Sequence, residues 1–179
     1  MLRLLAPSRM KTKLEVSATK ARTLLFLGIG VVLVFLDQLT KELAIATLSD
    51  GQVVAVVGEL LRFRLVYNDA AAFSLGVGQT WVLALVAIAA VLVLLWFGPK
   101  AKNLTWSAIA GLVLGGAAGN LVDRLTREPG FLNGHVVDFI AIPFNFPIFN
   151  LADTFLVIGV SLAMLRTLMG DELGGKVAK

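Results

Sequence analysis

Two aspartates, Asp138 and Asp153, are the residues whose type and setting best fit chemistry. Asp138 stands between Val137 and Phe139, and Asp153 lies in an apolar stretch six residues after Pro147. Two acids in close proximity cannot both ionise, so they hold one proton between them. The ionised acid can take a proton from water while the neutral acid donates one to a peptide carbonyl, and a proton then passes from the pair to the leaving amine. Such a pair predicts peptide hydrolysis by an aspartic protease.

The composition excludes several other kinds of site. The sequence has no cysteine, so thiol nucleophiles, thiolate metal sites and disulfides are ruled out. The single histidine, His135, rules out any site that needs two imidazoles. We therefore expect no metal and no cofactor. The net charge of +4 predicts segments that face anionic lipid rather than a nucleic-acid partner.

The elements that must position the two acids are membrane helices. Hydrophobic residues make up 58% of the chain and charged residues 16%, against about 45–50% and about 25% in a soluble domain. Four apolar segments are long enough to span a bilayer, and they cover residues 23–39, 81–98, 104–122 and 148–169. We expect a membrane all-α protein of four transmembrane helices, with a small extracytoplasmic β-sheet and an outer loop.

The expected β element lies within residues 51–75, where residues 52–57 and 60–67 have strand patterns. In the second of these, Arg62 and Arg64 alternate with apolar residues. We expect the sheet to lie on the outer membrane surface. The connection before the fourth helix carries turn and breaker residues rather than a helix pattern.

The ends of the chain are expected to lie outside the peptidase domain, which covers residues 21–170. Residues 1–20 form a basic arm, expected to be mobile, and residues 171–179 form a tail. The first span resembles a cleavable signal peptide in its basic approach, but Asp37, Lys41 and Glu42 interrupt the stretch before the small residues that follow it. We favour a retained helix.

Basic residues determine the expected orientation. Eleven Lys and Arg residues lie in the arm, the second connection and the C-terminal end, against five on the other side. Both termini are therefore expected in the cytoplasm. This topology brings one set of polar residues to the outer face, namely Asp37, Gln38, Lys41, Asn120, Asp123, Arg124, Asp138, Asn150 and Asp153.

Most of these polar residues also have a structural interpretation. An acid at a helix end is more often a cap or an ion-pair partner than a catalyst. Asp37 and Lys41, four residues apart, are expected to form an ion pair, and Asp123 with Arg124 a clamp at a helix end. Asn150 lies on the same helical face as Asp153 and could hydrogen-bond its partner. We keep the functional interpretation for Asp138 and Asp153.

Five sequence boxes, in order, resemble the lipoprotein signal peptidase (signal peptidase II) family. They are Asp37-Gln38-Leu39-Thr40-Lys41, Asn68-Asp69-Ala70-Ala71-Ala72-Phe73-Ser74, Gly119-Asn120-Leu121-Val122-Asp123-Arg124, Val137-Asp138-Phe139 and Asn150-Leu151-Ala152-Asp153. The sequence departs from the family pattern at Ala70, where a glycine is usual, and in the long stretch of residues 127–135.

The resemblance implies a function and roles. It implies an aspartic endopeptidase of the bacterial cytoplasmic (inner) membrane, which cuts the signal peptide of a diacylglyceryl-modified prolipoprotein before the lipidated cysteine. Its site would lie near the outer face, and its partners would be lipidated prolipoproteins and membrane lipid; we expect a monomer. The implied roles are catalytic for Asp138 and Asp153, substrate-binding for Asn68, Asn120, Arg124 and Asn150, and supporting for Asp37, Lys41 and Asp123.

Two other classes of function are open. A small transporter could use an intramembrane acid to carry protons or cations, but it would need Asp153 deep in the bundle, and no internal repeat is evident. A membrane assembly factor could carry the same acids as purely structural groups.

Overall fold

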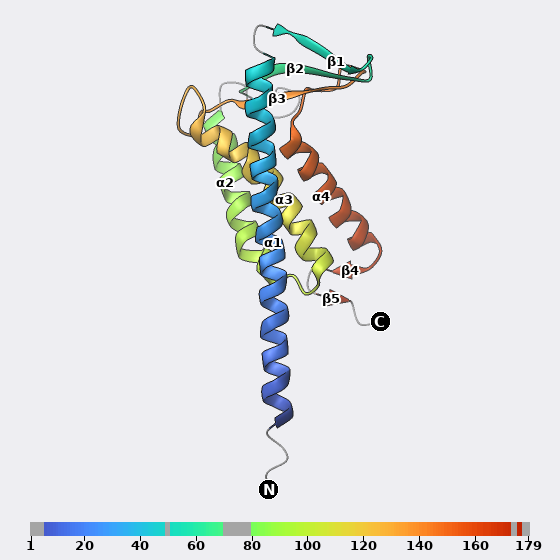
Figure 1. Ribbon diagram of the computed structural model, residues 1–179. Coiled ribbons are helices and arrows are strands. Elements are labelled where there is room, and N and C mark those ends of the chain that lie inside the picture. Colours follow the sequence, from blue (N-terminus) through green and yellow to red (C-terminus); the bar gives the residue numbers. More distant parts are fainter. Residues whose placement is uncertain (1–5, 49–50, 70–79, 173–174, 177–179) are drawn as a thin grey trace.

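The protein is a bundle of four long helices with a small sheet at one end (Figure 1). This computed structural model describes residues 6–48, 51–69, 80–172 and 175–176. The long helices are α1 (Ala6–Thr47), α2 (Thr80–Phe97), α3 (Leu104–Thr126) and α4 (Leu151–Leu168). All four are long and apolar enough to cross a membrane, which confirms the four predicted spans. Of the second sequence box, Asn68 and Asp69 are described, whereas residues 70–74 lie outside the described residues.

Helix α1 is far longer than the predicted span of residues 23–39. Its 42 residues measure about 63 Å at about 1.5 Å per residue, roughly twice the hydrocarbon thickness of a bilayer. Residues 6–20, expected as a mobile arm, are helical and project beyond the rest of the bundle (Figure 1). The physical reason is composition, because Pro7 lies in the first turn, where proline is tolerated, and no glycine or proline follows until Gly28.

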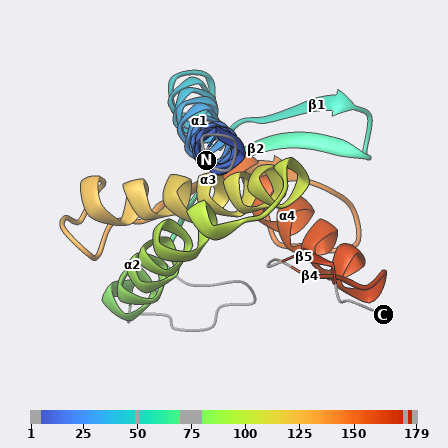
Figure 2. The ribbon, with the colours of Figure 1, turned by 90° about the horizontal axis from the view of Figure 1, so that it is seen from below.

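Helix α3 is the central element, with α1 on one side and α2 and α4 on the other (Figure 2). Small residues make this possible. A Cβ added at Gly115 would lie 2.6 Å from Leu33 of α1, and one at Gly116 would lie 2.5 Å from the backbone oxygen of Ala152 in α4. The glycines of α3 therefore let both neighbours approach its backbone closely, as expected for a small-residue stripe in a membrane helix.

The sheet has three antiparallel strands in the order β1 (Val53–Val57), β2 (Leu61–Asn68) and β3 (Val136–Ala141). The two predicted strands are confirmed. The third was not predicted, because its residues lie in a connection rich in turn signals. It forms by pairing with β2, where Val66 lies opposite Asp138 and Asn68 opposite Val136.

The sheet packs on the end of α1. Ala44 of α1 and Leu48, the residue that follows α1, form a buried cluster with Phe139 of β3, and Phe63 and Leu65 of β2 pack against it. These are the apolar residues of β2 that the alternating pattern placed on one side. The cluster fixes the height of β3, and hence of Asp138, relative to the helices.

The opposite end of the bundle carries short elements. A 3-10 turn, η3 (Gly98–Lys100), follows α2, and the strands β4 (Asp171–Glu172) and β5 (Gly175–Lys176) follow α4. The start of α1 lies at this same end, away from the three-stranded sheet (Figure 1).

Candidate active site

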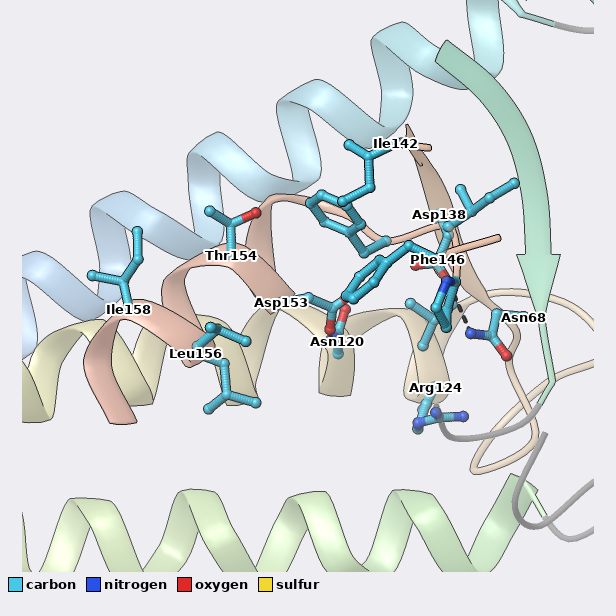
Figure 3. A pocket seen from close by; sticks show the side chains of 15 residues that line it. Asn68, Asn120, Arg124, Asp138, Ile142, Phe146, Asp153, Thr154, Leu156 and Ile158 are labelled. Atoms are coloured by element: carbon cyan, nitrogen blue, oxygen red, sulfur yellow. Dashed lines mark hydrogen bonds between the residues drawn. The ribbon is translucent and has the colours of Figure 1, made fainter. Parts of the chain in front are cut away.

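Asp138 and Asp153 lie on two sides of one amide side chain, that of Asn150 (Figure 3 shows both acids). Asn150 Nδ2 donates to Asp138 Oδ1 at 2.7 Å. Asn150 Oδ1 accepts from the backbone N–H of Asp153 at 2.9 Å. The connection after β3 therefore folds back over the start of α4 and brings the two acids into one site.

The start of α4 is set by a capping box. Asn150 is the N-cap, and the Asp153 side chain accepts in return from the Asn150 N–H at 3.2 Å. The helix thus begins at Leu151 rather than at residue 148, so Asp153 lies in its first turn. One oxygen of Asp153, Oδ2, therefore has the structural role of a helix cap. The other, Oδ1, accepts from Asn120 Nδ2 at 2.7 Å.

Asp138 is almost fully buried in β3, with 2% of its surface exposed. Asn68 Nδ2 donates to its second oxygen at 2.7 Å. The pKa of Asp138 is raised from 3.8 to about 7, chiefly by burial and in smaller part by the charge of Asp153, while hydrogen bonds from Asn68 and Asn150 and the charge of Lys41 oppose the rise. Asp138 therefore retains a proton up to about neutral pH, as a general acid must.

Behind the two acids lies a buried charge cluster formed by Asp37, Lys41 and Asp123, which are 0% exposed. Lys41 Nζ lies 2.7 Å from Asp37 Oδ2, which confirms the predicted ion pair, and 2.8 Å from Asp123 Oδ2. Asp123 also pairs with Arg127 at 2.8 Å. Arg127 follows Asp123 by four residues, so the two side chains lie on the same side of α3.

The charge cluster ties four elements together. Asp37 Oδ1 accepts from the N–H of Ala152 in α4 at 2.9 Å, and Asp123 Oδ2 accepts from the N–H of Val137 in β3 at 3.1 Å. Gln38, for which no role was predicted, donates to Asp123 Oδ1 at 3.1 Å and to Gly119 O at 3.1 Å. The sequence offered one indication of a role for Gln38, namely its position next to Asp37 in the first sequence box.

A cavity of about 510 Å³ opens in front of the acids. Its polar wall consists of Asn68, Asn120, Arg124, Asp138 and Asp153. Its apolar wall consists of Ile142, Phe146, Phe149, Leu156, Val157 and Ile158, among others, from α4 and the connection before it. The apolar wall was not predicted, because a turn-rich connection has no periodicity that marks a cavity.

Figure 3 shows how these walls are arranged along the cavity. Leu156 and Ile158 lie at one end, Asp153 and Asn120 in the middle, and Asn68 and Arg124 at the other end. Asn150 is fully buried and is not one of the lining residues. Three of the four predicted substrate-binding residues thus face the cavity, and the fourth lies behind the acids.

Three further acids form ion pairs outside the charge cluster. Glu42 pairs with Arg127, Glu59 with Arg62, and Asp171 with Arg166. Within the part of the chain that the structure describes, no three acidic or histidine side chains are grouped to hold a metal ion.

A family model described as signal peptidase (SPase) II matches residues 29–169, which include α2, α3, α4, the sheet and both acids. The chain belongs to the signal peptidase II family. Family membership makes it a multi-pass bacterial membrane protein and an aspartic peptidase with lipoprotein signal peptidase activity. It also favours the peptidase over the transporter and the assembly factor.

Similar proteins cover most of the chain. A lipoprotein signal peptidase of Leifsonia xyli subsp. xyli is 44% identical over 177 residues, which are 96% of this chain and 82% of that protein. A lipoprotein signal peptidase of Rhodococcus jostii is 46% identical over 154 residues, which are 86% of this chain and 77% of that protein.

Two solved structures of bacterial membrane enzymes share the fold. One, at 2.3 Å resolution, has a TM-score of 0.72 and 33% identity, and the match covers 80% of this chain and 87% of that one. Another, at 1.9 Å resolution, has a TM-score of 0.70 and 32% identity, covering 82% and 94%. The four helices and the sheet are therefore the fold of a membrane enzyme.

Proposed function

We propose that this member of the signal peptidase II family removes the signal peptide from diacylglyceryl-modified prolipoproteins, cutting before the lipidated cysteine, with Asp138 and Asp153 as its catalytic pair. One observation carries the proposal. The two acids, joined through Asn150, face the polar end of a cavity whose other wall is apolar. A substrate that is half peptide and half lipid needs both walls.

The chemistry follows from the protonation of the two acids. A water molecule between the acids attacks the scissile carbonyl carbon while Asp153, ionised, takes one of its protons and Asp138, neutral, gives its proton to the carbonyl oxygen. The tetrahedral diol then collapses, and the C–N bond breaks. Asp153 passes its proton to the leaving nitrogen, and Asp138 regains one from the diol hydroxyl. Both acids return to their starting state.

The cavity supports a division of substrate contacts. Leu156, Val157 and Ile158 of α4 would lie against the acyl chains, because apolar surface leaves water favourably there. Asn68, Asn120 and Arg124 would hold the peptide backbone and the ester groups. The substrate would enter sideways from the lipid, with its acyl chains still among the helices.

The distribution of charge supports the orientation. The start of α1 and the end of α4 lie at one end of the bundle, and the sheet with both acids lies at the other (Figure 1). The first end carries most of the Lys and Arg residues. By the positive-inside rule both termini would be cytoplasmic and the site would lie near the outer face. The peptidase domain would comprise residues 21–170 and act as a monomer.

Substitution of each acid tests the proposal. We expect Asp138→Asn and Asp153→Asn to lower the cleavage rate of a diacylglyceryl precursor in detergent by on the order of 10³-fold or more, with the protein still folded and inserted. Asp171→Asn, which removes a charge at the far end of α4, is the control and should cleave normally. Normal processing by either Asp138→Asn or Asp153→Asn would refute the catalytic assignment.

A further inference from the structure

Lys41 is buried and lies behind the cavity rather than in its wall. Its ammonium group has three N–H donors and no acceptor. Three oxygens receive them: Asp37 Oδ2 at 2.7 Å, Asp123 Oδ2 at 2.8 Å and Asn120 Oδ1 at 3.0 Å. The ion pairs with Asp37 and Asp123 account for two of the three donors. The third contact, to an uncharged amide, requires a different explanation.

Asn120 stands between Lys41 and the proposed base. Its Oδ1 accepts from Lys41 Nζ at 3.0 Å and from Asn150 Nδ2 at 3.0 Å, and its Nδ2 donates to Asp153 Oδ1 at 2.7 Å. An amide turned by 180° would place its NH₂ against two donors and its oxygen against a carboxylate. All three contacts would then be repulsive, so the neighbours determine one orientation.

The orientation of Asn150 is determined in the same way. Its Oδ1 is held by the backbone N–H of Asp153, so its Nδ2 must face Asp138 Oδ1 and Asn120 Oδ1. Asn150 is thus fixed by the helix backbone. The Asn120 side chain, inside α3, instead hydrogen-bonds the side chains of Lys41, Asp153 and Asn150, and Lys41 is the cation among these three partners.

We propose that Lys41 is a positioning residue, which fixes the orientation of the Asn120 amide and so keeps an N–H directed at Asp153. This inference rests on the proposed function, in which Asp153 is the base. A cation on the amide oxygen polarises the amide and strengthens the hydrogen bond from its NH₂ to the carboxylate. Lys41 thereby maintains the hydrogen bond that Asn120 donates to Asp153, the group that removes a proton from water, without touching the substrate.

A merely structural Lys41 would neutralise Asp37 and Asp123 and do nothing more. The two roles differ in whether the effect of Lys41 passes through Asn120. If the effect of Lys41 passes through Asn120, the effects of Lys41→Met and Asn120→Ala on kcat are not additive. If Lys41 acts independently of Asn120, the two effects add. Substitution of Lys41 leaves two buried acids without their cation, which can prevent folding. The experiment therefore also needs a variant background in which the buried charges remain balanced.

A double-mutant cycle supplies the test. Lys41→Met and Asn120→Ala are made singly and together in the wild type, and again on an Asp37→Asn background, where Asp123 keeps Arg127 as its partner. We expect Lys41→Met to lower kcat roughly tenfold to a hundredfold with KM changed less than about twofold. On top of Asn120→Ala, the same substitution should change kcat less than about twofold.

Rescue by a neutral donor gives a second readout. On the Asp37→Asn background, Lys41→Gln keeps an N–H for Asn120 Oδ1, and we expect it to retain several-fold more kcat than Lys41→Met. The inference would be overturned if Lys41→Met lowered kcat by the same factor with Asn120 and with Asn120→Ala. It would also be overturned if the Lys41→Gln and Lys41→Met variants had equal kcat at equal thermal stability.

The two proposals fail in distinguishable ways. If Asp153→Asn processes a precursor normally, Asp153 is not the base, and the role of Lys41 falls with it. If Asp138→Asn and Asp153→Asn are inactive and the Lys41–Asn120 cycle is additive, the catalytic pair stands and only the positioning role is wrong.

Discussion

The carboxylate of Asp37, in α1, accepts a hydrogen bond from the backbone N–H of Ala152, in the first turn of α4. The other oxygen of Asp37 pairs with Lys41. A side chain from the first helix thus satisfies one of the unpaired N–H groups at the start of the fourth, two residues after Asn150, the capping residue that contacts both acids. The position of the catalytic pair depends on this contact between the first and last helices.

Removal of the Asp37 carboxylate should therefore loosen the site. We expect Asp37→Ala to lower the free energy of unfolding by about 3–5 kcal/mol, because it leaves Lys41 short of a partner in a buried cluster and frees the Ala152 N–H. Asp37→Asn, which can still accept from Ala152, should cost less. Thermal unfolding in detergent measures both. Equal midpoints for the two variants would show that the Ala152 contact contributes nothing.

The rate of cleavage should fall as the pH rises through about 7. The pKa of Asp138 is raised by burial from 3.8 to about 7, and the proposed acid must carry a proton. Its contribution to stability has the same sign: it is fully present below about 3.8 and is lost as the pH rises through about 7. A plot of kcat/KM against pH, which reports the groups of the free enzyme, should show an alkaline limb near 7.

Asn68 offers a test of that assignment. Its hydrogen bond to Asp138 favours the ionised carboxylate and so lowers the pKa. Asn68→Ala should raise the pKa of Asp138 and move the alkaline limb to higher pH. Asn133→Ala, in an exposed turn, is the control and should leave the limb in place. A limb that moves to lower pH in Asn68→Ala would mean that another group governs it.

The close approach of α3 and α4 predicts opposite results for two glycines. A Cβ at Gly116 would lie 2.5 Å from the backbone oxygen of Ala152, whereas one at Gly28 of α1 would have nothing within 4 Å. Gly116→Ala should destabilise the protein by about 1–3 kcal/mol and shift the start of α4. Gly28→Ala should be neutral or slightly stabilising. Midpoints of thermal unfolding measure both effects. A Gly116→Ala protein as stable as the wild type would contradict the close packing of α3 against α4.

The apolar wall of the cavity should govern the affinity for lipid. Ile158→Trp adds volume to a lining residue, and we expect it to raise KM for a diacylglyceryl precursor roughly tenfold with little change in kcat. Val160→Trp is the control, because Val160 is an exposed residue of the same helix that does not line the cavity. Equal KM values for the two tryptophan variants would place the acyl chains elsewhere.

The sequence by itself determined the features that local patterns encode. Runs of apolar residues identified four spans, and the topology of four spans brings Asp37, Asn120 and Asp153 to one end of the bundle whatever the packing. The spacing of Asp37 and Lys41 defined their ion pair, since residues four apart meet on any helix. The alternation in residues 60–67 likewise identified a strand before any partner was known.

Only the tertiary structure decided how these pieces meet. Strand β3 exists because it pairs with β2, about 70 residues earlier in the chain, and its turn-rich surroundings conceal it from local patterns. Asn150 caps α4 and joins the acids, and Asn120 connects Lys41 with Asp153, through contacts between residues remote in sequence. Periodicity reports which face of an element is apolar. It does not report which polar group from another element will lie within 3 Å, because that depends on the packing of whole helices.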